Sequence, residues 1–206
     1  MTRKMWVINL QTKKYSKHEF DRPKLSMDEI ISQLPSGVYT TMRTVCKTKI
    51  FQFQYHLNRI VESYQLSSGK FPYEINNLRH CLHTFIQEFS SNEVRIRIQI
   101  PLSEPHLAYV ILEELTIPTP EDYKNGVSVI TNKLIRDNPK AKLTSFIVKS
   151  EDIKKKLREQ KSEESIIINS QNQLLEGLSS NFFAVKNFKI FTAEKDVLNG
   201  ATREII

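Results

Sequence analysis

Apolar and polar side chains alternate one by one through residues 93–100, EVRIRIQI, and a second apolar run follows at 107–112. Alternation with a period of two is typical of strands that bury one face. Pro101 and Pro105 lie between the runs. The pattern therefore predicts two adjacent strands, and the apolar residues 5–10 predict a first strand near the N-terminus.

Spacings of three and four between apolar residues predict helices elsewhere. From 73 to 89 these residues are Ile75, Leu78, Leu82, Phe85, Ile86 and Phe89. They share one face of a helix. The same spacing predicts a helix over about 54–64. Between 149 and 164 lysines and carboxylates balance one another, which predicts a solvated helix extending to about Lys161.

The chain changes character around Pro118 and Pro120, where we expect a domain boundary. A strand is predicted at 127–131, and two pairs of short strands are predicted within 166–175 and 182–192, each around a turn. We therefore expect an α/β (α+β) fold of two subdomains with mixed sheets and flanking helices. The expected parts are residues 1–117, a linker at 118–125, and residues 126–206.

Composition excludes several classes of protein. The 206 residues are 39% hydrophobic and 26% charged, which is typical of a globular chain. The five glycines are too far apart for the glycine-rich loops that bind dinucleotides or nucleoside triphosphates. Two cysteines are too few for a disulfide scaffold. His80, Cys81 and His83 have a spacing that zinc could use, but they lie within a predicted amphipathic helix, so no metal site is expected.

The net charge is +7, and residues 1–50 hold ten Lys or Arg against four Asp or Glu. A basic arm for nucleic acid is one interpretation. A solvated strand and loop is the favoured one, because only Tyr15 and Phe20 are interleaved for base stacking. No segment is long and apolar enough for a membrane span or a signal peptide. A cytoplasmic protein is expected, with organellar targeting as the alternative because no acidic residue precedes Glu19.

Four segments together resemble one family, the fold-type IV pyridoxal-phosphate enzymes or class IV aminotransferases. Residues 176–183, EGLSSNFF, resemble the family's E-G-x-x-x-N-x-F, and residues 197–203, VLNGATR, resemble its L-x-G-I-T-R. Lys142 lies 34 residues before the first of these motifs, a separation similar to that of the family's lysine. Residues 37–43, GVYTTMR, resemble the strand near the substrate, and residues 56–60, HLNRI, resemble H-x-x-R-L.

The resemblance implies a D-amino-acid aminotransferase-like fold, the cofactor pyridoxal 5'-phosphate and a homodimer. It implies that Lys142 is the Schiff-base and proton-transfer residue, which must lose its proton before it can attack an aldehyde. Lys140 is the alternative, since both would share one face of a strand. Glu176 is the implied partner of the cofactor's pyridinium nitrogen, which a carboxylate stabilises.

The phosphate site is implied to consist of Arg59 with Ala201 and Thr202. Arginine offers charge-assisted hydrogen bonds, and the start of a helix offers backbone N–H groups to an anion. Tyr39 and Arg43 are implied on the substrate side. Family members continue beyond the T-R motif, so the second subdomain is expected to be incomplete in this sequence.

These expectations lead to an aminotransferase that moves an amino group between an amino acid and a 2-oxo acid. Thr40 stands where many relatives carry an acid, and residues 145–147 lack the tyrosine found in branched-chain enzymes. D-amino-acid aminotransferases and aminodeoxychorismate lyases are therefore equally good relatives. The alternatives are a pyruvate-releasing lyase and a non-catalytic, truncated relative with a basic binding surface.

Overall fold

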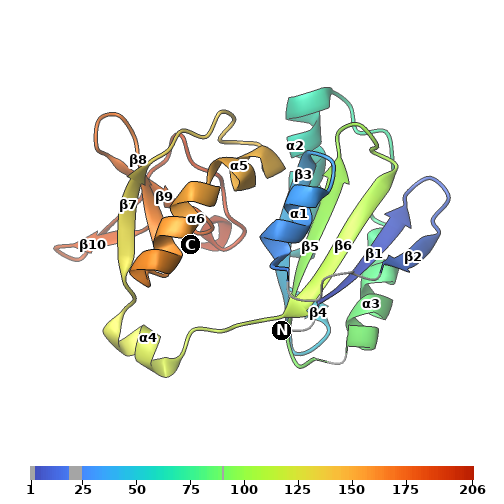
Figure 1. Ribbon diagram of the computed structural model, residues 1–206, viewed down its shortest axis with the longest axis horizontal. Coiled ribbons are helices and arrows are strands. Elements are labelled where there is room, and N and C mark those ends of the chain that lie inside the picture. Colours follow the sequence, from blue (N-terminus) through green and yellow to red (C-terminus); the bar gives the residue numbers. More distant parts are fainter. Residues whose placement is uncertain (1–2, 19–24, 90) are drawn as a thin grey trace. The chain divides into compact units, whose positions relative to one another are not determined.

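The computed structural model describes residues 3–18, 25–89 and 91–206. Glu19 and Phe20, which enter the targeting and nucleic-acid arguments above, lie outside the described residues. Contacts group the chain into two compact units (Figure 1). The first unit comprises residues 1–116 with 141–145, and the second comprises 117–140 with 146–206. The segment containing Lys142 therefore belongs with the N-terminal half of the chain.

A six-stranded antiparallel sheet with the order β2-β1-β6-β5-β3-β4 forms the centre of the first unit (Figure 1). Its strands are β1 (Arg3–Asn9), β2 (Tyr15–His18), β3 (Gly37–Val45), β4 (Lys49–Ile50), β5 (Val94–Pro101) and β6 (Leu107–Glu114). The predicted first strand is confirmed as β1. The two adjacent strands predicted from alternation are confirmed as β5 and β6, which pair directly.

Alternation along β5 gives this strand one apolar and one polar face. Ile96, Ile98 and Ile100 are fully buried in the main core, together with side chains from α2 (Phe53–Ser68) and α3 (Leu78–Phe89). On the opposite face Arg97 forms an ion pair with Asp28 of α1 (Met27–Gln33). The apolar stripes of the two longer helices therefore cover one side of the sheet, as their periodicity predicted.

The helix predicted from residue 73 begins only at Leu78. Asn76 and Asn77 form a turn in which the N–H of Leu78 donates to the carbonyl of Ile75. Asparagine favours turns because its side chain competes for nearby backbone groups. Ile75 is still buried in the core, so apolar spacing continued beyond the helix itself.

The second unit contains a mixed three-stranded sheet and a hairpin. In the sheet β7 (Val129–Lys133) runs parallel to β8 (Glu164–Ile168), which pairs antiparallel with β9 (Leu174–Gly177). The hairpin joins β10 (Ala184–Lys186) to β11 (Lys189–Phe191). The predicted mixed sheet is thus confirmed in this unit. Its core includes Phe146, Ile167, Leu175 and Val197.

The remaining helices are short. They are α4 (Pro120–Asn125), α5 (Thr144–Lys149), α6 (Glu151–Gln160) and a 3-10 turn at Arg203–Ile205. The charged helix expected to end near Lys161 is α6. The segment expected as a linker holds α4, because Thr119 caps it through a reciprocal contact with Asp122 and Pro120 occupies its first turn. No helix among the described residues is long and apolar enough to cross a membrane.

Candidate active site

Lys142 is fixed through its backbone in the first unit. Its N–H donates to Ser63 Oγ of α2 at 3.0 Å, and its carbonyl accepts from the N–H of Tyr39 at 3.0 Å. The next residue, Leu143, forms a bridge with Val38 of β3. Lys142 lies outside the regular elements, two residues before α5 begins at Thr144. The N–H and the carbonyl of Lys142 are therefore both fixed by hydrogen bonds.

The amine of Lys142 lies over the ring of Tyr39, with Nζ 4.9 Å from the ring centroid. The guanidinium carbon of Arg97 lies 5.3 Å from the same centroid. Two cations therefore flank one buried aromatic ring, an arrangement that the negative ring face favours. Lys140, the alternative to Lys142, is exposed and belongs to the second unit.

Arg59, Thr40 and His56 form a buried cluster next to this lysine. Arg59 Nη2 donates to Thr40 Oγ1 at 2.8 Å and lies 3.1 Å from His56 Nδ1. Thr40 Oγ1 is 2.7 Å from the same ring nitrogen. Because Thr40 accepts from Arg59, its own hydrogen points to Nδ1, which therefore acts as an acceptor and carries no proton. Thr40 thus orients both the arginine and the histidine.

Burial, together with the positive charges of Arg59 and Lys142, lowers the pKa of His56 to about 3. Burial also lowers the pKa of Arg59 below its ordinary value, while the nearby Tyr55 acts against this shift. At neutral pH the imidazole is therefore uncharged and the guanidinium remains protonated. The cluster presents positive charge from Arg59 and Lys142.

We expect His56 to make folding sensitive to acid. Its pKa in the folded chain lies below that of an ordinary histidine, so the unfolded chain binds the proton more tightly. Its contribution to stability is present near neutral pH and is lost as pH falls from about 6.5 toward 3. By linkage, the stability of the wild type relative to His56→Asn should fall by about 2–3 kcal/mol between about pH 7 and about pH 4.5. Urea unfolding at the two pH values measures this, and equal pH dependence in both proteins would contradict it.

Glu176 on β9 is buried in the second unit. Its Oε1 accepts from Arg136 Nε at 3.0 Å, and its Oε2 accepts from the N–H of Leu198 at 3.0 Å. The Arg136 guanidinium lies 3.5 Å from the centroid of the Phe146 ring. The carboxylate is therefore fixed by one charged and one neutral donor.

The glutamate motif and the T-R motif meet in the second unit. Asn181 Nδ2 donates to the carbonyl of Leu198 at 2.8 Å, and Leu198 in turn donates its N–H to Glu176. A Cβ at Gly200 would clash with Asn181 Oδ1, so a larger residue would displace that amide. Ala201 is buried and Thr202 is exposed at the start of the 3-10 turn.

The structure separates the sequence-predicted residues into groups. Lys142, Tyr39 and Arg59 come together in the first unit. Arg43 lies four residues farther along β3, roughly 13 Å from Tyr39 at strand spacing, and donates to the carbonyl of Thr44. It does not join the group around Lys142. Glu176, Ala201 and Thr202 lie in the second unit.

Three residues that sequence analysis did not assign to the site contribute to it. Arg136 pairs with Glu176, Ser63 holds the backbone of Lys142, and His56 contacts Arg59. His56 lies in the H-x-x-R-L segment, so that motif carried a signal for it. Arg136 and Ser63 have no motif spacing. Among the described residues, no group of three or more His, Cys, Asp or Glu could hold a metal ion.

Solved structures share this fold over nearly the whole chain. A hypothetical aminotransferase from Mycobacterium tuberculosis is 19% identical, with a TM-score of 0.73, and the match covers 97% of this chain and 75% of that one. A candidate branched-chain amino acid aminotransferase from Thermotoga maritima is 26% identical with a TM-score of 0.73, covering 98% and 70%. A candidate 4-amino-4-deoxychorismate lyase is 16% identical with a TM-score of 0.71, covering 91% and 76%. No curated protein sequence matches this chain.

The amino-transferase class IV family matches residues 37–206. This span includes all four motifs and both groups of site residues. The chain therefore belongs to the class IV aminotransferase family, and the family resemblance and fold class expected from the sequence are confirmed.

Proposed function

We propose that this chain is a pyridoxal-phosphate-dependent aminotransferase that moves an amino group between an amino acid and a 2-oxo acid. The observation that carries the proposal is Lys142, held through both backbone groups while its amine lies over the ring of Tyr39. Family membership supports pyridoxal phosphate as the cofactor. The Mycobacterium tuberculosis neighbour is described in a PLP-bound form and in a form with α-ketoglutarate and PMP.

Lys142 is proposed to attach the cofactor and to move the substrate's α-proton. Bound pyridoxal phosphate supplies an aldehyde carbon and an electron-withdrawing ring. The amine of Lys142 must be unprotonated to attack. The ring of Tyr39 contacts the amine of Lys142, and Tyr39 is proposed to face the substrate. Arg43 is not part of this proposal, because it lies away from Lys142 along β3.

Arg59 is proposed to hold the cofactor phosphate, together with backbone and hydroxyl donors of Ala201 and Thr202. The fit rests on charge. Arg59 is 7% exposed. Burial lowers the pKa of Arg59, and its contacts with Thr40 and His56 hold the guanidinium in place. A dianionic phosphate is the kind of group that such a buried guanidinium binds.

Glu176 is proposed to stabilise a protonated pyridine nitrogen. Arg136 and the N–H of Leu198 hold the carboxylate in place through two hydrogen bonds. A homodimer, which the family resemblance implies, is part of the same proposal.

The purified protein with pyridoxal phosphate, a panel of D- and L-amino acids and α-ketoglutarate tests the function. We expect the donor to be converted to its 2-oxo acid and glutamate to form in equal amount, because an amino group lost by one must be gained by the other. Both products are measured by chromatography. Omitting α-ketoglutarate should stop the reaction after about one turnover per chain.

A lyase is the second candidate, because one neighbour of the same fold is a candidate aminodeoxychorismate lyase and residues 145–147 lack the tyrosine of branched-chain enzymes. Continued pyruvate release from aminodeoxychorismate without any 2-oxo acid would select the lyase. No turnover with either set of substrates would favour the remaining alternative, in which this chain is a non-catalytic member of the family.

A further inference from the structure

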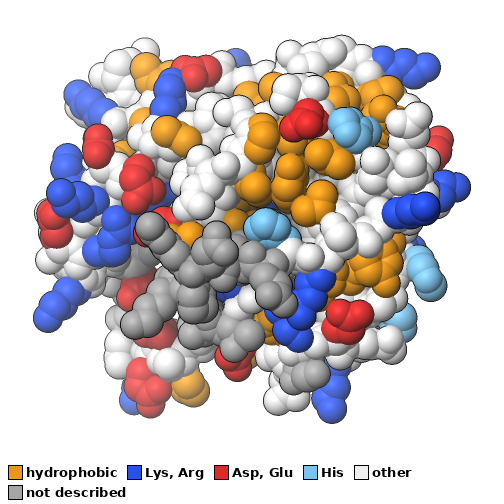
Figure 2. Space-filling view, turned by 45° about the vertical axis from the view of Figure 1, so that its right-hand side comes forward, with side chains coloured by type: hydrophobic (Ala, Val, Ile, Leu, Met, Phe, Trp, Pro, Cys, Tyr) orange, Lys and Arg blue, Asp and Glu red, His pale blue; other side chains and the backbone are white. Residues whose placement is uncertain are grey.

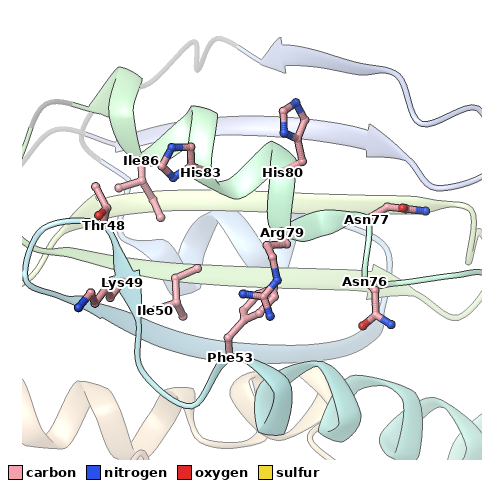
Figure 3. Close-up of a pocket in the computed structure, with 10 residues that line it drawn as sticks. All are labelled: Thr48, Lys49, Ile50, Phe53, Asn76, Asn77, Arg79, His80, His83 and Ile86. Carbon is pink, nitrogen blue, oxygen red and sulfur yellow. The ribbon is translucent and has the colours of Figure 1, made fainter.

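A pocket of about 760 Å³ lies in the first unit, between the β3–β4 turn, the start of α2 and α3 (Figure 3). Its residues come from three segments, 48–53, 76–77 and 79–86. None of the residues assigned above to the cofactor or the substrate lines it. The pocket is therefore separate from the group formed by Lys142, Tyr39 and Arg59.

Polar side chains with hydrogen-bond donors form the rim of the pocket. They are Lys49, Asn76, Asn77, Arg79, His80 and His83. In Figure 3 the histidines project from α3, Lys49 projects from β4, and the Arg79 guanidinium lies beside Phe53. The lining contains no aspartate or glutamate. Its charge is therefore positive, and its donors come from several directions.

The floor of the pocket is apolar. Phe53 and Ile86 are buried, and Ile50 is partly buried and packs against the same core. The Arg79 guanidinium carbon lies 4.7 Å from the centroid of the Phe53 ring. A cation over an aromatic ring is held in place but keeps its charge. An aliphatic or ring-containing ligand body would therefore have a surface to cover below the charged rim.

Some surface cations of the chain are neutralised by a neighbouring carboxylate. Lys149 pairs with Asp137, and Arg158 with Glu151. On the face in Figure 2, Lys and Arg side chains lie interspersed with Asp and Glu side chains. No ion pair or side-chain hydrogen bond joins Lys49 or Arg79 to a carboxylate among the residues that the structure describes. Positive charges grouped in a hollow without nearby carboxylates concentrate an anion-attracting field.

We propose that this pocket binds a small organic anion with two or more phosphate or carboxylate groups. Arg79 and Lys49 bind the anionic groups, since guanidinium and ammonium donate charge-assisted hydrogen bonds to both kinds of oxygen. His80, His83 and the two asparagines supply further donors. More than one anionic group is expected because the cations come from separate segments. The site would make the first unit a receptor for a second ligand besides the cofactor.

Pyrophosphate and citrate are suitable probes, because one offers phosphate groups and the other carboxylates. Each is titrated into the ¹⁵N-labelled full chain, already saturated with pyridoxal phosphate, at low salt. We expect saturable amide shifts at residues 48–53 and 76–86 with at least one probe. Loss of two charge-assisted contacts in Lys49→Gln/Arg79→Gln should weaken binding by about tenfold or more. Whichever probe binds more tightly identifies the preferred anionic group.

A double variant of the same charge provides the control. Lys186→Gln/Lys189→Gln lowers the net charge equally but alters only the exposed β10–β11 hairpin. Its affinity should stay within about twofold of the wild type, since distant exposed charges are screened. Equal weakening in both double variants would overturn the proposal, as would shifts located elsewhere or no saturable shifts. Binding to single-stranded DNA with neither small anion bound would also overturn it.

Discussion

Lys142→Ala is expected to abolish the borohydride-stable attachment of pyridoxal phosphate, because it removes the amine that lies over the ring of Tyr39. The wild type should retain about one cofactor per chain after reduction, on a peptide containing Lys142. Amino-group transfer by the variant should fall by roughly 10²–10⁴-fold, the usual contribution of a residue that moves a proton in the reaction. Peptide mass spectrometry and the coupled product assay measure the two effects.

Lys140→Ala is the matched control for this result. Lys140 is only two residues away but is exposed and lies in the second unit, so its loss should leave labelling unchanged. The alanine at position 142 keeps the backbone hydrogen bonds to Ser63 and Tyr39, which protects the local fold. Cofactor trapped on Lys140 in the wild type would disprove the assignment of Lys142.

Glu176→Ala is expected to lower the free energy of unfolding by about 3–5 kcal/mol, because it leaves the buried Arg136 guanidinium without its carboxylate. The two side chains are 4% and 7% exposed and 3.0 Å apart. The variant also removes the acceptor for the N–H of Leu198. Urea unfolding measures the loss.

Two further variants separate this effect from a general loss of charge. Arg158→Ala breaks an ion pair with Glu151 whose side chains are 66% and 53% exposed, and it should cost less than about 1 kcal/mol. In Glu176→Ala/Arg136→Met no unpaired buried charge remains, so most of the lost stability should return. If the double variant were as unstable as the sum of the two single variants, the buried pair would not be the cause.

Sequence patterns predicted local structure well where burial repeats along one element. Residues 93–100 alternate because β5 has a core face and a polar face, and the apolar residues of α3 recur because one side of it covers the sheet. The predicted helix start at residue 73 was wrong, because Ile75 is buried in the core although it lies before the helix, next to a turn. Burial produces the apolar spacing, and a turn that packs on the core produces it as well.

The segment around Lys142 shows a different limit. The chain there makes a single bridge, from Leu143 to Val38, and then enters α5. Whether a short segment pairs with a strand depends on partners more than 70 residues away, here Ser63 and Tyr39. No local spacing encodes those partners. The contact between Arg136 and Glu176 could not be predicted for the same reason.

The sequence by itself determined the family of this protein, the order of its motifs and the residue types that can do the chemistry. Those properties depend on neighbours along the chain and on positions that accept only one residue type, such as Gly200 beside Asn181. Tertiary structure alone decided that Lys142 joins the N-terminal unit, that Arg43 stays apart, and that His56 is neutral. These depend on burial and on charges brought together from distant segments, and a linear pattern of residues does not contain them.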